Sequence, residues 1–337
     1  MNIELDYPLK SLNSFGMDVY ARKFAGFTTL EDLQELHTTQ KEFNQGFILG
    51  GGSNILFTKN VDGLVLKNEI KGIEILKEEG DDVYIRAGAG EPWHSFVLYC
   101  IEHGFAGIEN LALIPGQVGA SPMQNIGAYG VEIKDVFYCL DAYHKEDGKM
   151  HTFYNGDCEF GYRESVFKRK FKNQFIINRV TLKLSKKPNY HIEYGAIRQQ
   201  LNEMGIKDLS IRAVANAVMA IRSAKLPDPK IVGNAGSFFK NPEIDIAKFE
   251  DLKKEFPQIM GYPVSNGFVK IPAGWLIEQC GWKGYREGDA GCHPLQALVL
   301  VNYGKATGED IFLLSEKIVN SVFQKFTVQL EREVNIL

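Results

Sequence analysis

The chain has 337 residues, of which 45% are hydrophobic and 24% are charged, and its formal net charge at pH 7 is −4. A chain of this length is too long to fold around one hydrophobic core of ordinary size, which predicts two or three domains. The composition is that of a globular protein. The slightly negative charge argues against a nucleic-acid-binding surface, and no apolar run approaches the ~20 residues that cross a bilayer. Because the first ten residues lack the basic start and apolar core of a signal peptide, the sequence predicts a cytoplasmic protein.

Residues 1–67 predict a small α/β unit. Thr29 and Asp32 resemble a capping box ahead of leucines that recur at helical spacing. A strand is expected at 47–49, followed by the turn G-G-G-S-N and a second strand at 63–67. A turn of bare backbone at the end of a buried strand can bind an anion such as phosphate.

Residues 68–214 predict a second unit, of α+β type. Two hairpins are expected, around the polar turns E-E-G-D-D and K-E-D-G, because apolar strands flank each turn. An amphipathic helix is expected from Pro92 to Gly104, and a further strand over 175–184.

The second unit also contains a long glycine-rich stretch at 111–130, which reads L-A-L-I-P-G-Q-V-G-A-S-P-M-Q-N-I-G-A-Y-G. Its glycines let backbone amides approach a ligand without intervening side chains. Together with the first glycine turn, it fits a bulky ligand that carries a pyrophosphate. Neither run matches the Rossmann fingerprint or the P-loop, and the glycines of either run alone could instead serve only tight turns.

The third predicted unit covers residues 215–326. A helix is expected to start near Ser210 and to stop at Leu226-Pro227, since proline cannot continue a helix. Helices are expected at 245–255, 273–280 and 309–325, and a strand at 295–302. The tail at 327–336 alternates like a strand that returns to an earlier domain, so the predicted division is 1–67 with 327–337, then 68–214, then 215–326.

Cysteine and histidine spacing predicts neither disulfides nor a metal. None of the seven histidines pairs with another at the spacing of a known metal-ligand motif. The cysteines are far apart, odd in number and without a C-x-x-C, which favours buried reduced thiols. They are Cys100, Cys139, Cys158, Cys280 and Cys292.

The two glycine runs resemble the flavin-binding segments of the UDP-N-acetylenolpyruvoylglucosamine reductase family, also called UDP-N-acetylmuramate dehydrogenases. Three later segments are similar to the same family and follow in its order: F-G-Y-R-E-S at 160–165, K-L-P-D-P-K through N-A-G-S-F-F-K-N-P at 225–242, and L-E-R-E-V at 330–334. The resemblance implies an α+β fold. It comprises an FAD-binding fold of the vanillyl-alcohol-oxidase type in two α+β units, plus a smaller α/β substrate-binding domain.

The resemblance also implies a reaction, the NADPH-dependent, FAD-mediated reduction of UDP-N-acetylglucosamine enolpyruvate to UDP-N-acetylmuramate in peptidoglycan synthesis. Hydride addition to the enol ether leaves negative charge beside a carboxylate, which calls for a nearby cation and a proton donor. Arg163 matches the family's cation, Ser237 its proton donor and Glu333 the acid on the opposite side of the substrate. On sequence alone Glu331 is as eligible as Glu333, Arg163 could pair with Glu164, and Ser237 could cap its own backbone.

The family match also assigns binding residues. The flavin pyrophosphate and ring would contact Gly51, Gly52, Ser53, Asn54, Gly116, Ser121, Pro122, Gln124, Asn125 and Gly127. No histidine or cysteine lies in these segments, so the FAD is expected to be non-covalent. The UDP-sugar would contact Tyr129, Tyr162, Tyr194, Lys225, Asn241 and Gln296. Of these, Tyr194 resembles the loop tyrosine that closes over substrate in one subtype of the family.

Two other functions stay open on sequence. One is an FAD-linked oxidase or dehydrogenase of a hydroxylated substrate, although the motifs show neither a base poised for proton abstraction nor a histidine for a covalent flavin link. The other is a non-enzymatic nucleotide-sugar binding module, which would purify colourless. The expected partners are the UDP-sugar substrate and NADPH, and the chain is expected to be a monomer without nucleic-acid or membrane partners.

Overall fold

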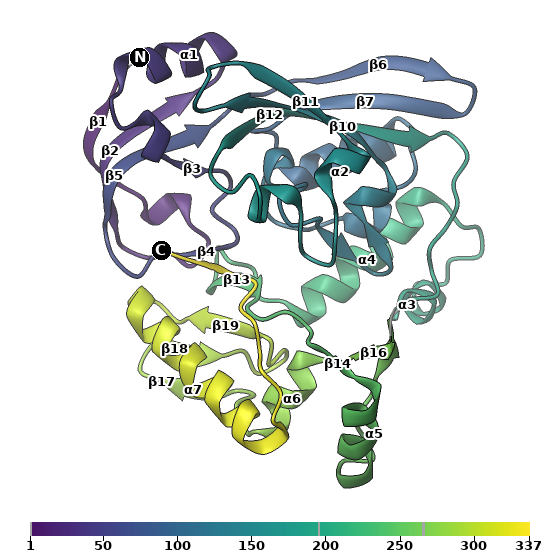
Figure 1. The fold of residues 1–337 in the computed structure, drawn as a ribbon. Helices are drawn as coiled ribbons and strands as arrows, with labels where there is room; N and C mark the ends of the chain where they lie inside the picture. Colours follow the sequence, from purple (N-terminus) through teal and green to yellow (C-terminus); the bar gives the residue numbers. More distant parts are fainter. Residues whose placement is uncertain (1, 195, 265–266) are drawn as a thin grey trace. The chain divides into compact units, whose positions relative to one another are not determined.

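The computed structural model describes residues 2–194, 196–264 and 267–337. Its internal contacts divide the chain into two compact units (Figure 1). Unit 1 contains the residues up to Tyr7, 20–52 and 61–224, and unit 2 contains 8–19, 53–60 and 225–337. The predicted first two parts thus fall largely together in unit 1, while the tail groups with unit 2, so the three-part division stays a prediction.

Unit 1 is built on a five-stranded antiparallel sheet with the order β11-β10-β12-β7-β6. Both predicted hairpins are present in it, as β6 (Ile73–Glu79) with β7 (Asp82–Gly88) and β10 (Phe137–His144) with β11 (Met150–Tyr154). The central strand is β12 (Phe175–Ser185).

Two predicted helices bury their apolar faces against this sheet. They are α2 (Trp93–Glu102) and α4 (Ile211–Lys225), which Figure 1 shows on one side of the strands. A short helix between them in sequence, α3 (Ile197–Glu203), was not predicted. The shared core contains Ile85, Trp93, Val97, Val180, Leu182 and Val218.

A second sheet of unit 1 has the order β1-β2-β5-β3, formed by β1 (Glu4–Pro8), β2 (Tyr20–Phe27), β5 (Val61–Asn68) and β3 (Phe47–Leu49). Its strands β2, β5 and β3 are parallel. The predicted capping box is confirmed, because Thr29 accepts from the Asp32 amide at the start of α1 (Leu30–Thr39) and the Asp32 carboxylate accepts in return.

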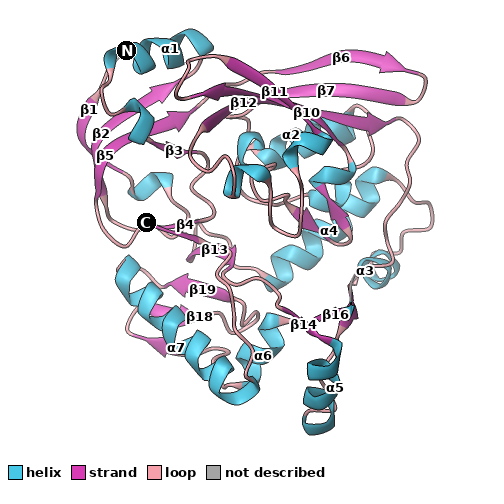
Figure 2. Ribbon diagram, viewed as in Figure 1, coloured by secondary structure: helices cyan, strands magenta, loops and turns pink. Residues whose placement is uncertain are grey.

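Unit 2 contains a sheet with the order β13-β19-β18-β17. Its strands are β13 (Gly233–Ser237), β17 (Arg286–Glu287), β18 (Ala290–Cys292) and β19 (Val299–Asn302). The predicted strand at 295–302 therefore begins only at Val299. Helix α7 (Gly308–Phe326) packs against β18, β19 and α6 (Ala273–Gln279) (Figure 2).

A smaller three-stranded sheet in unit 2 has the order β14-β16-β15. It consists of β14 (Glu243–Asp245), β15 (Tyr262–Pro263) and β16 (Phe268–Lys270), with α5 (Ile246–Glu255) packed beside it. No helix among the described residues is long and apolar enough to cross a membrane. All five cysteines are free thiols, and all but Cys280 are buried.

The tail is extended but is not the continuous strand that its alternation predicts. It forms an isolated bridge between Arg332 and Phe239, and then β20 (Asn335–Ile336) pairs in parallel with β4 (Ile55–Leu56). The backbone changes partner within three residues, so no ladder of regular length can form.

Candidate active site

The first glycine turn is built for close approach of backbone. A Cβ on Gly51 would lie 2.9 Å from the Cα of Gly116, so only glycine lets the two glycine runs meet. Gly52 has a φ of 61° and is buried. The amide nitrogens of Gly51 and Gly52 donate to no acceptor in the described part of the chain. Unpaired amides in a turn of this kind fit an anionic group such as a pyrophosphate.

The second glycine run is joined to the F-G-Y-R-E-S segment by Asn125. Its side-chain amide donates to Glu132 Oε2 (3.0 Å) and to the Gly161 carbonyl (2.9 Å), and its Oδ1 accepts from the Lys134 amide (3.1 Å). The side chain is completely buried, and both of its N–H groups are used within the protein. Any contact of Asn125 with a flavin would therefore involve its backbone rather than this amide.

The other predicted flavin residues of this run are placed along the same loop. Ser121 is buried and donates its hydroxyl to the Val118 carbonyl (2.6 Å), which leaves that hydroxyl committed to the loop. Pro122 is buried, and Gly116, Gln124 and Gly127 are half-buried.

Arg163 lies in a tight turn whose two ends, Gly161 and Glu164, exchange backbone hydrogen bonds. Its φ of 55° is left-handed, an uncommon conformation for a residue with a Cβ and one that clusters at functional sites. Its guanidinium donates to the Gly127 carbonyl (2.6 Å), lies 3.9 Å from a Glu132 oxygen and packs 5.1 Å from the Tyr162 ring. The structure thus brings the predicted cation next to the predicted flavin loop.

Two predicted substrate tyrosines lie near each other in unit 1. Asn110, which is buried, donates to the carbonyls of Tyr129 (3.0 Å) and His191 (2.7 Å), and so joins their two segments. Tyr194 lies three residues after His191, and a Cβ on Gly130 would lie 3.2 Å from the Tyr194 Cβ. The Tyr194 side chain is 55% exposed, which leaves it accessible to a ligand.

Arg222 is a half-buried cation of unit 1 that was not predicted from the sequence. Burial lowers the pKa of its guanidinium, and its Nε has no hydrogen-bond partner among the described residues. Burial also lowers the pKa of His94 and raises that of Tyr129, and the Arg222 charge acts on both groups. A half-buried, partly unpaired guanidinium fits an anion or a carbonyl-rich ring. Its position on α4, three residues before Lys225 and so on the same helix face, was the available signal.

In unit 2, Ser237 and Glu333 belong to adjacent backbone segments. The Glu333 amide donates to the carbonyl of Phe238 (2.9 Å), the residue that follows Ser237. Asn54, another predicted flavin residue, donates its side-chain amide to the Glu333 carbonyl (3.2 Å). The Ser237 hydroxyl is half-buried and makes no hydrogen bond with the described residues, so it is available to a ligand.

The two acids of the tail differ in their surroundings. The Glu331 side chain is 69% exposed and forms an ion pair with Lys240, whose own side chain is only 7% exposed. Glu333 is half-buried beside Asn54 and Phe238. The backbone of Glu333 thus pairs next to Ser237, and the choice between the two acids stays a prediction.

The remaining substrate candidates of unit 2 lie at the start of α6 or at the end of α4. Asn241 accepts from the amide of Ala273 (2.9 Å), and a Cβ on Gly274 would lie 3.0 Å from Gln296 Oε1. The first turn of α6 thus brings Asn241 and Gln296 together. Lys225 is exposed and ends α4, and Ser53 is half-buried.

Comparisons with known proteins agree with this arrangement. Residues 22–154 match an FAD binding domain, and residues 228–337 match the C-terminal domain of UDP-N-acetylenolpyruvoylglucosamine reductase. A protein of that name from Flavobacterium johnsoniae is 49% identical, and the alignment covers 100% of both chains. Another, from Pseudomonas savastanoi pv. phaseolicola, is 50% identical over 100% of this chain and 99% of the relative. The crystal structure of the Thermus caldophilus reductase matches with a TM-score of 0.67 at 25% identity, covering 99% of this chain and 98% of that one.

An α+β chain with an FAD-binding domain and this second unit is a flavin oxidoreductase. It belongs to the UDP-N-acetylenolpyruvoylglucosamine reductase family. The family resemblance and the α+β FAD-binding fold predicted from sequence are therefore confirmed, whereas the subtype with the tyrosine loop stays a prediction.

Proposed function

We propose that this chain reduces UDP-N-acetylglucosamine enolpyruvate to UDP-N-acetylmuramate, with FAD bound non-covalently and NADPH as the reductant. The observation that carries the proposal is the backbone pairing of the Ser237 and Glu333 segments, in which the serine hydroxyl makes no hydrogen bond with the described residues and Glu333 is half-buried. Membership of the reductase family supports the choice of reaction.

The described residues of unit 1 fit a flavin cofactor. The unpaired amides of Gly51 and Gly52 would hold its pyrophosphate, and Arg222 supplies a half-buried cation whose Nε has no partner among the described residues. When bound, the FAD supplies the hydride that saturates the enolpyruvyl double bond.

Each proposed catalytic residue meets one requirement of the remaining chemistry. Arg163 carries a permanent charge that would stabilise the negative charge developing beside the substrate carboxylate. Ser237 would donate the proton to the carbanion, which is a strong enough base to take it from a hydroxyl. Glu333 would orient the substrate or relay a proton. Tyr129, Tyr162, Tyr194, Lys225, Asn241 and Gln296 are the proposed substrate contacts. A monomeric state and a cytoplasmic location complete the proposal.

The two half-reactions can be tested separately under anaerobic conditions. NADPH should reduce the bound flavin, and addition of the enolpyruvyl substrate should reoxidise it rapidly while UDP-N-acetylmuramate forms. A flavin that stays reduced until oxygen is admitted would refute the substrate and favour the oxidase alternative. A protein that purifies colourless and takes up no FAD would refute both.

Variants then assign the roles. Ser237→Ala should leave flavin reduction intact and slow the second half-reaction by about 10² to 10⁴. Glu333→Gln should also slow the second step, whereas Glu331→Gln should stay within about twofold of the parent, because the Glu331 side chain is 69% exposed and its neutral amide can still accept from Lys240. Equal effects of the two glutamate substitutions would contradict the assignment of Glu333.

A further inference from the structure

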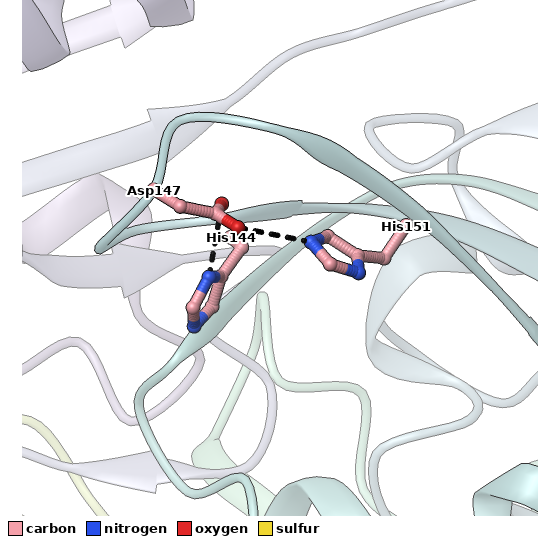
Figure 3. A group of neighbouring side chains, drawn as sticks. All are labelled: His144, Asp147 and His151. Atoms are coloured by element: carbon pink, nitrogen blue, oxygen red, sulfur yellow. Dashed lines mark ion pairs between the residues drawn. The ribbon is translucent and has the colours of Figure 1, made fainter.

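Two histidines and an aspartate meet at the turn between β10 and β11, away in sequence from every residue of the proposed reaction. His144 ends β10, Asp147 lies in the turn and His151 lies in β11. Figure 3 shows both imidazole rings directed toward the Asp147 carboxylate. His144 Nδ1 lies 3.0 Å from Asp147 Oδ1, and His151 Nε2 lies 3.4 Å from Oδ2.

The hairpin register explains why the two rings meet. His144 closes the hairpin opposite Lys149, and His151 pairs with Ala142, so the histidines are diagonal neighbours on one face of the ladder. The spacing H-x-x-D-x-x-x-H resembles no helical or loop motif for a metal. It becomes a cluster only because a four-residue turn lies between the histidines.

The local electrostatics call for a positive charge between these groups. His144 Nδ1 is buried and has no hydrogen-bond partner among the described residues, although a carboxylate oxygen lies 3.0 Å away. That charge can come from protonation of the imidazoles, which then pair with Asp147, or from a cation that the three groups share. A cation at that point would satisfy all three groups.

The cluster is held in place by its surroundings. The Phe175 ring stacks on His144 with a centroid distance of 4.6 Å and contacts His151 edge-on at 5.5 Å. Asp147 Oδ1 accepts from the Lys149 amide (3.0 Å), which orients the carboxylate. Ligands that are fixed before binding lose little conformational freedom, and hydrogen bonds to a ligating carboxylate are typical of metal sites.

We propose that His144, Asp147 and His151 bind one divalent transition-metal ion, with zinc as the preferred ion. One ligand atom from each residue lies within 4.8 Å of the others. In a tetrahedral zinc site with bonds of 2.0–2.1 Å, ligand atoms lie about 3.3 Å apart. The His144 and His151 nitrogens lie 3.0 and 3.4 Å from the two different oxygens of Asp147, so either oxygen can serve as the third ligand after a small shift. Two imidazoles with a single carboxylate suit zinc, cobalt or nickel and not magnesium or calcium, which require mainly oxygen ligands.

An ion bound at the β10–β11 turn would have a structural role. β11 is an edge strand of the five-stranded sheet, and the ion would join it to β10 across the turn. The three ligands belong to neither the proposed flavin residues nor the proposed substrate residues. Binding can therefore be measured without turnover, and its failure would say nothing about the reductase reaction.

The test uses the full-length flavoprotein after treatment with a chelator and removal of that chelator. Titration with ZnCl₂ at neutral pH, followed by calorimetry, should give one bound ion per chain. Asp147→Asn keeps an oxygen for the Lys149 amide, and His151→Ala changes a side chain that is 42% exposed, so both variants should fold. Each should weaken zinc binding by at least about tenfold. His103→Ala changes an exposed histidine that directly follows α2, outside the cluster, and should bind zinc like the parent.

Thermal unfolding with and without zinc provides a second, independent measurement. Zinc should raise the melting temperature of the parent and of the His103 variant, and should not raise that of the Asp147→Asn, His151→Ala double variant. Absence of stoichiometric binding to the parent would overturn the proposal. Unchanged affinity in the double variant would overturn it too, because the ion would then be held elsewhere.

Discussion

Asn125 offers the sharpest test of how the glycine-rich stretch at 111–130 and the Arg163 segment at 160–165 are held together in unit 1. Its buried amide makes three hydrogen bonds, to Glu132, Gly161 and Lys134. Its φ of 44° is left-handed, a conformation that asparagine tolerates better than alanine does. Asn125→Ala therefore removes three bonds and adds backbone strain, whereas Asn125→Gly removes the same bonds without the strain.

The expected loss follows from these contacts. Each hydrogen bond contributes about 1 kcal/mol, and the Gly161 carbonyl and Lys134 amide are left without this partner, which brings the cost for Asn125→Gly to about 3 kcal/mol. The strain adds about 1 kcal/mol in Asn125→Ala. For a folding unit of this size, 1 kcal/mol lowers the melting temperature by roughly 2 to 4 °C, so the alanine variant should melt roughly 10 °C below the parent.

The assay is thermal unfolding followed by far-UV circular dichroism, with and without added FAD. Asn202→Ala is the control, because Asn202 is an exposed residue of α3 and its side chain makes no hydrogen bond with the described residues. Because Asn125 anchors the glycine-rich stretch that is proposed to line the flavin, FAD affinity should fall together with stability. An alanine variant that melts within about 2 °C of the Asn202 control would refute the reasoning.

Three further predictions concern other parts of unit 1. Gly51→Val should abolish retention of yellow flavin on purification, since a Cβ at position 51 would lie 2.9 Å from the Gly116 backbone. Gly63→Ala is the control and should purify yellow, because no atom lies within 4 Å of a Cβ at position 63. Burial lowers the pKa of Lys145 from 10.5 to about 8, below its value in the unfolded chain. Folding therefore disfavours the charged form, and the free energy of unfolding of the parent should rise by about 3 kcal/mol between pH 8 and 10.5, relative to that of Lys145→Met. Urea unfolding of both proteins at several pH values measures this difference. Plots of unfolding free energy against pH that run parallel for the two proteins would contradict the prediction. Thr29→Ala removes the helix cap of α1 and should cost about 1 kcal/mol in the same assay, and no change would mean that the cap is not formed in solution.

Elements with a strong local pattern could be predicted from the sequence. The capping box of α1, both hairpins and the periodic helices α2, α4, α5 and α7 all appear close to their expected places. Elements that depend on a distant partner could not. β13 reads G-N-A-G-S, which has no strand preference, and it is a strand because β19 pairs with it.

The site shows the same limit. The glycine runs and the motif of Arg163 could be recognised by family resemblance, but their mutual contacts depend on the fold. Asn125 was assigned to the flavin because of its motif, and the structure shows its amide fully used by the protein. Arg222 and the His144 cluster were missed, because a helix face and a hairpin register decide which side chains meet. The catalytic and binding roles of the predicted residues stay predictions.

The pairing of β4 with β20 has a consequence for synthesis of the protein. The bond from Asn54 to Glu333 spans 279 residues, and at about 5 to 20 residues per second the ribosome needs roughly 15 to 55 s to supply the partner. During that interval Ile55, Leu56 and Phe57, all buried in the finished protein, lack the strand that pairs beside them. A nascent chain paused before residue 332 would therefore display an uncovered apolar segment and bind chaperones that recognise such segments. It would acquire the Asn54 side of its proposed flavin site only when the tail is made.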